Sequence, residues 1–152
     1  MIVVMIVLAI SIRWIIGSLR AYDRGRVEQE IASEIDRFIS MVQLIYTSGP
    51  GNGAVIEFNA ASGTVTHIDC VIFGDCPGGN MASIIRYTIQ GRAEVMTLLE
   101  SPNVPMMSSD NASFQISSGN FRIMAECVSG NMDLNGDGLT DGYSGIVPVS
   151  AY

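Results

Sequence analysis

The first 47 residues form one continuous helical pattern whose character changes halfway along. Residues 1–12 carry no charge, Arg13 interrupts them, and the apolar run resumes at Trp14 and ends at Arg20. A helix of 19 residues is roughly 28 Å long, close to the thickness of the hydrocarbon core of a bilayer. Apolar side chains on all sides of a helix have to be buried in lipid or against other helices. The sequence therefore predicts a membrane-spanning or helix-bundling segment at residues 1–19.

We expect the apolar side chains of this segment to form the core of any assembly that it builds. Arg13 stands apart, because a charge inside a lipid-facing helix costs about 2.5 kcal/mol or more. A partner in a protein bundle, or a place near the lipid boundary, would lower that cost. The expected core residues are Met1, Ile2, Val3, Val4, Met5, Ile6, Val7, Leu8, Ile10, Ile12, Trp14, Ile15, Ile16 and Leu19.

From Ala21 onward, apolar residues recur at three- and four-residue steps, which is the pattern of an amphipathic helix. No proline falls before the breaker cluster at residues 48–53, where the helix is expected to end. One helix over residues 1–47, roughly 70 Å long, is predicted. Its second half should pack on its own globular domain, with the charged face toward water or neighbours. The apolar stripe is Tyr22, Val27, Ile31, Ile35, Phe38, Ile39, Val42, Ile45 and Tyr46, and the charged face is Asp23, Arg24, Arg26, Glu28, Glu30, Glu34, Asp36 and Arg37.

Residues 48–152 are predicted to form an exposed β-rich head, because the apolar period changes to two after the glycine-rich break. A hairpin is expected where residues 114–116 and 121–125 flank a Ser-Ser-Gly-Asn turn. The predicted fold class is α+β: a long N-terminal helix, residues 1–47, packed on an antiparallel, sandwich-like head, residues 48–152. The expected strands are residues 54–58, 64–68, 70–73, 83–89, 95–99, 114–116 and 121–125.

The charge of the chain is divided between these two parts. Residues 48–152 hold three arginines against ten acidic residues, a formal charge of −7, whereas residues 1–47 are neutral. An acidic head lacks the basic face that nucleic-acid binding needs. It suits a protein that faces outward and stays soluble by like-charge repulsion.

The sequence shows no signature of an enzyme. His67 is the only histidine and lies in a strand-like run without a second metal ligand at suitable spacing, which indicates a structural role. The glycine-rich segment 49–53 lacks the Lys-Ser/Thr ending of a phosphate loop. No G-x-S-x-G motif is present.

The three cysteines, Cys70, Cys76 and Cys127, leave the pairing open. Two would pair in an oxidising exterior, and one would remain. Cys70–Cys76 closes a short ring around the turn at Gly74 and Asp75, and Cys127 is the alternative partner of either one.

Residues 133–141 match the first nine positions of a calcium loop, in which oxygen ligands at alternate positions converge on one cation. The twelfth position is Ser144, where an EF-hand has glutamate. The alternative is an acidic turn without metal. Calcium, if bound, would have a structural role, and no cofactor is required; the candidate ligands are Asp133, Asn135, Asp137, Leu139 and Asp141.

Asn111, in the sequence Asn-Ala-Ser, is a candidate N-glycosylation site within a polar loop.

The helix ends in Ile45-Tyr46-Thr47-Ser48-Gly49-Pro50-Gly51, a tyrosine and glycine step into the first strand. Together with the apolar start and a head of about a hundred residues, this layout resembles archaeal type IV pilins. Met1 and Met5 stand where bacterial type IV pilins usually have phenylalanine and glutamate, so the resemblance is to the archaeal branch.

The resemblance implies a structural subunit of an extracellular adhesive filament. The chain would wait in the cytoplasmic membrane, processed by a prepilin peptidase, and an assembly ATPase with a membrane platform would extract it. Its helices would then bundle with those of other copies, heads outward. Arg13 would meet Asp23 or Glu28 of a neighbour, or simply reach water or backbone carbonyls. The alternatives are a membrane-anchored monomeric binding module and an archaellin-like motility subunit.

Overall fold

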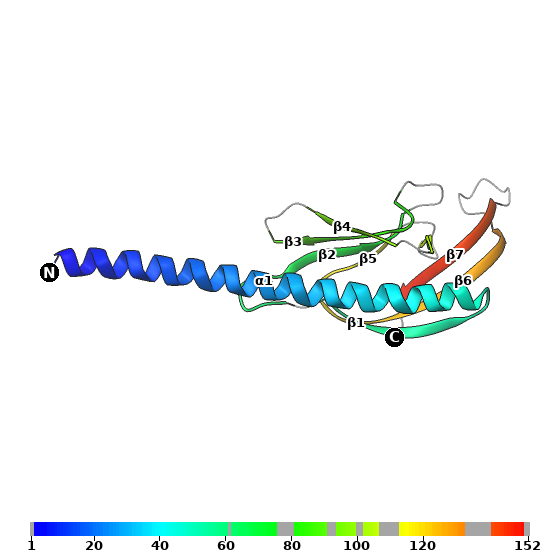
Figure 1. Cartoon of the computed structure of the whole chain (residues 1–152), viewed down its shortest axis with the longest axis horizontal. Coiled ribbons are helices and arrows are strands. Elements are labelled where there is room, and N and C mark those ends of the chain that lie inside the picture. The colour runs from blue at the N-terminus through cyan, green and yellow to red at the C-terminus, as the bar shows by residue number, and fades with distance from the viewer. Residues whose placement is uncertain are drawn as a thin grey trace.

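A computed structural model describes residues 2–60, 62–75, 81–90, 94–99, 102–106, 113–132 and 141–150. One helix, α1 (Ile2–Ser48), runs along the head and projects far beyond it at the N-terminal end (Figure 1). Gly17 and Gly25 lie inside α1 without interrupting it. A glycine in a helix costs about 1 kcal/mol relative to alanine, which the remaining 45 helical residues outweigh. The predicted single helix is confirmed.

The described part of the head consists of two antiparallel sheets (Figure 1). The three-stranded sheet has the order β1-β6-β7, and the four-stranded sheet has the order β4-β3-β2-β5. The α+β class, with the long N-terminal helix packed on an antiparallel head, is therefore confirmed. The strands are β1 (Gly53–Ala60), β2 (Ile68–Phe73), β3 (Ile84–Ile89), β4 (Val95–Leu98), β5 (Phe114–Ile116), β6 (Gly119–Met132) and β7 (Asp141–Ser150).

The core of the head includes the amphipathic half of α1. Six apolar side chains of the helix, spaced three or four residues apart, are at most 5% exposed. Phe38 of α1 contacts Phe58 of β1 edge-on, with ring centroids 5.8 Å apart, and Phe73 of β2 at 4.7 Å. Phe38 therefore joins the helix to both sheets. The six buried helix residues are Val27, Ile31, Ile35, Phe38, Val42 and Ile45.

Two of the predicted strand features are wrong. Residues 64–67 were expected in a strand, but they form a bend and a loop, and β2 begins only at Ile68. The predicted hairpin between residues 114–116 and 121–125 does not form, because β5 pairs with β2 while β6 pairs with β1 and β7. The turn before Gly119, which has φ 146°, carries the chain from one sheet to the other. Alternating patterns specify which residues face the core but not which strand is the partner.

The longest pairing among the described strands was not predicted. Strand β6 extends to Met132, and β7, which was not predicted, pairs with it from Asp141 to Ser150. The proline at position 148 weakens the strand pattern, but β7 lies at the edge of its sheet, where a missing amide donor is tolerated.

The junction between α1 and β1 depends on glycine. Gly49 and Gly51 have φ of 91° and 82°, a region that other residues rarely adopt. The Asn52 side-chain amide donates to the carbonyls of Ser48 and Gly49 at the helix end. These bonds satisfy orphan carbonyls of the last turn, so the breaker cluster stops the helix and aims the chain into β1.

We predict that Phe38→Ala lowers the free energy of unfolding by about 3–5 kcal/mol, since it removes the ring that joins α1 to both sheets. Leu44→Ala is the matched control, because Leu44 lies on the exposed face of the same helix; its effect should stay within about 0.5 kcal/mol. Urea denaturation of the detergent-solubilised chain measures both. Equal effects of the two substitutions would contradict this account of the core.

Candidate assembly interface

The projecting part of α1 is an apolar rod without a cover. Every described side chain from Val4 to Tyr22 is exposed. The exposed fraction of the large apolar side chains runs from 43% at Ile16 to 77% at Trp14 and includes all sides of the helix. Eleven of the predicted core residues, from Val4 to Leu19, belong to this rod. The predicted core residues Met1, Ile2 and Val3 lie outside the described side chains.

Burying this rod is strongly favourable. Each large apolar side chain contributes about 1.5–3 kcal/mol when it leaves water, so the eleven together contribute on the order of 20 kcal/mol. A soluble monomer rarely exposes so large a contiguous apolar surface. The rod therefore needs lipid or other apolar helices around it.

The length of the rod fits either environment. Within the described residues, α1 is long and apolar enough to cross a membrane, through the stretch near its N-terminus that is not buried by the head. Residues 4–22 span roughly 28 Å at the standard helical rise.

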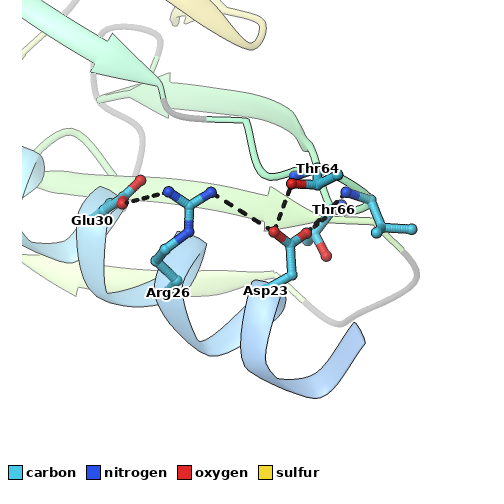
Figure 2. Close-up of polar contacts among 6 residues, drawn as sticks. Asp23, Arg26, Glu30, Thr64 and Thr66 are labelled. Carbon is cyan, nitrogen blue, oxygen red and sulfur yellow. Dashed lines mark hydrogen bonds and ion pairs between the residues drawn. The ribbon is translucent and has the colours of Figure 1, made fainter. Parts of the chain in front are cut away.

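Asp23 marks the point at which α1 meets the head (Figure 2). Its carboxylate accepts hydrogen bonds from the backbone amides of Thr64, Val65 and Thr66, at 3.0, 2.9 and 3.0 Å. Three successive amides that converge on one anion form a nest. Arg26 lies 3.7 Å from the same carboxylate and 3.2 Å from Glu30. Asp23 was expected on the water-facing side of the helix, but it is only 8% exposed and ties the head to the helix.

These hydrogen bonds stabilise the charged form of Asp23. The amide of Val65 contributes most, followed by that of Thr64, and the pKa of the carboxyl falls from 3.8 to about 2 despite partial desolvation. The unexpected loop at residues 64–67 has the same cause, because amides that bond to Asp23 cannot join a strand ladder.

A second polar contact fastens α1 to the edge strand β1. Arg37 and Glu34 form an ion pair at 2.6 Å. Arg37 also donates to the carbonyl of Glu57, and the amide of Asn59 donates to Glu34 at 3.3 Å. The helix thus satisfies backbone groups on the free edge of β1, which otherwise offers a template for another strand. Glu34 and Arg37, both predicted to face water or neighbours, instead contact the head.

The arrangement changes the expected role of Arg13. Asp23 was one of its two expected partners in a neighbouring subunit, but that carboxylate is already occupied by its own head. Glu28, the other expected partner, is half-buried. Burial raises the pKa of the Tyr87 phenol, and the nearby charge of Glu28 raises it further. In the described part of the chain, Arg13 and Arg20 form no ion pair.

The remaining candidate sites are mostly outside the described residues. Cys70 and Cys127 do not pair with each other, and Cys127 is 1% exposed. Cys76, Asn111 and the calcium-loop residues Asp133, Asn135, Asp137 and Leu139 are not described. The pairing of Cys76 with Cys70 or with Cys127, glycosylation and calcium binding therefore stay predictions.

The backbone of Asp141 does fall within the described residues. It opens β7 opposite Met132, so the predicted calcium loop is the connection between β6 and β7. Among the residues that the structure describes, no three His, Cys, Asp or Glu side chains gather as metal ligands. His67 lies 3.2 Å from Asp69 on the surface.

Comparison of the chain with known protein families, curated protein sequences and solved structures finds no match in any of the three.

We predict that Asp23 makes the free energy of unfolding of the protein depend on pH. Because its pKa is lower in the folded chain, its contribution is fully present above about pH 4 and is lost as the pH falls through about 2. Asp23→Asn should lack this component, so its unfolding free energy should change less over that range. Denaturant titrations at several pH values measure the difference. Parallel pH profiles for the two proteins would show that the nest does not favour the ionised carboxylate.

We predict that Gly63→Ala disrupts the same contact sterically. A β-carbon at position 63 would overlap Asp23 Oδ2 and lie 2.7 Å from the carboxyl carbon, so the carboxylate has to leave the nest. The pKa of Asp23, followed by NMR titration of the carboxyl carbon, should return toward 3.8. Combining Gly63→Ala with Asp23→Asn should destabilise the chain by less than the sum of the single effects. Strict additivity would mean that the glycine is required for another reason.

Proposed function

We propose that this chain is the structural subunit of an extracellular filament of the archaeal type IV pilin kind, used for surface attachment. The observation that supports this most is the apolar rod, which projects from the head on a helix that the head itself holds in place. Bundling of such rods buries the exposed side chains and leaves the acidic heads facing water. The localisation is the cell surface, after a stage in the cytoplasmic membrane.

The attachment of the rod favours a polymer over a simple anchor. The helix that emerges as a rod is the same helix whose Val27, Ile31 and Phe38 fill the core of the head. Asp23 fixes the head to the helix at the point where the rod emerges. A flexible linker would suffice for an anchor, whereas a fixed exit direction lets every subunit present its rod in the same orientation.

Two alternatives use the same rod differently. A membrane-anchored monomeric binding module would keep it in lipid, which its length permits. An archaellin-like subunit would also bundle its rod with those of other copies, but the resulting filament would drive motility instead of attachment. Assembly of the adhesive filament would use an ATPase, a membrane platform and a prepilin peptidase, with other copies of the chain as the main partner.

Electron microscopy of material sheared from cells that express the chain tests the proposal. We expect thin filaments in which mass spectrometry finds this chain as the main protein. Leu8→Asp, which places a charge in the rod, should abolish them, while Val55→Asp on the exposed face of β1 should leave them intact. Extraction of the unaltered chain as a monomer by mild detergent, without filaments, would support the anchored module instead.

A further inference from the structure

We propose that the projecting helix has two functionally different sides, and that an arginine stripe on one side docks onto the acidic head of a second copy of the chain. The stripe consists of Arg13, Arg20 and Arg24. This inference rests on the proposed filament and adds what lies against the rod on each side.

The stripe follows from helical geometry. Arg13, Arg20 and Arg24 are separated by seven and four residues, so at 3.6 residues per turn they lie within about 20° of a common line along α1. Continued along the helix, the same line passes through the buried residues Ile31 and Phe38, again within about 20°. The side of the rod that carries the arginines is therefore the side on which the head sits.

The C-terminal end of the stripe borders a hollow between α1 and the head. Arg20 and Arg24 line this hollow together with Val65, Thr66 and Gln90. The Arg24 Nε atom is buried and has no hydrogen-bond partner. A buried donor without an acceptor is unfavourable, so an acceptor from outside the subunit would be favourable there.

Three of the five acids of the same helix already have partners. Asp23 accepts three backbone amides, Glu30 pairs with Arg26, and Glu34 pairs with Arg37. Arg13 and Arg20 form no ion pair among the described residues, so positive charge remains on the head side of the rod, while residues 48–152 carry a formal charge of −7. Charge complementarity points to the head of another copy as the occupant.

The opposite side of the rod carries no charged residue, and the hydroxyl of Ser11 there donates to the carbonyl of Val7. Val4, Leu8, Ile15 and Tyr22 lie on the far side of the helix, about 180° to 220° from the arginine line, and all are exposed. In a filament with outward heads, this side faces the bundle of helices and the arginine side faces the layer of heads. Arg13 then lies at the boundary between the two layers, which removes the cost of burying its charge in an apolar bundle.

Photo-crosslinking in assembled filaments tests the two sides directly. A photoreactive p-benzoylphenylalanine replaces Arg13 in one variant and Ile15 in the matched control, two residues along and on the opposite side. Position 13 lies about 10 Å along the helix from Arg20, which borders its own head, so only cross-links between two copies are counted. The cross-linked dimer band is digested and sequenced by mass spectrometry. We expect position 13 to reach residues 48–152 of the second copy and position 15 to reach residues 1–47.

The outcomes separate this inference from the proposed function. Helix peptides from both positions, in intact filaments, would overturn the two-sided rod while leaving the filament unaffected. Lipid adducts at position 13 instead of protein would identify anionic headgroups as the occupant and also overturn it. Absence of filaments from the unaltered chain would reject the proposed function itself.

A charge-reversal pair gives a second, independent readout. Arg20→Glu should lower the filament yield at low salt by about tenfold, because it sets like charges against each other. Arg122→Glu, on the exposed face of β6, is the control and should leave the yield unchanged. Added salt should reduce the difference in filament yield between Arg20→Glu and the unaltered chain, since screening weakens repulsion between exposed charges. Equal yields for both variants would contradict docking of the stripe onto an acidic head.

Discussion

The packing of Phe38 against both sheets is the interaction on which the rest of the structure depends. It places the second half of α1 inside the core of the head, where Phe58 and Phe73 meet it from different sheets. Because the helix is continuous, fixing one half fixes the direction of the other. The apolar rod is therefore a rigid extension of a folded core, and this rigidity makes it suitable for a regular assembly.

The polar contacts of α1 define where the core ends and the rod begins. Asp23 holds the loop at residues 64–66, and the Glu34–Arg37 pair covers the free edge of β1. Both contacts use charged side chains to satisfy backbone groups that strands leave unpaired. Charge-assisted hydrogen bonds of this kind are stronger than neutral ones. They also engage acids of the helix, whereas Arg13 and Arg20 form no ion pair in the described part of the chain.

The rod and the head consequently require opposite surroundings. The rod requires removal of its apolar surface from water, while the head carries the negative charge that keeps it solvated. An extended filament with a helical interior and exposed heads satisfies both demands at once. The arginine stripe lies where these two layers would meet, so its charge follows the same division.

The sequence by itself determined the helix from Ile2 to Ser48, its change from apolar to amphipathic, and most strands of the head, because these depend on local periodicity and on breakers such as Gly49 and Gly51. Only the tertiary structure decided that β5 and β6 enter different sheets, that β7 completes one of them, and that Asp23 binds a loop instead of water. Strand partners and buried ion sites join residues distant in the chain. Their energies arise from packing and amide geometry that no local pattern contains.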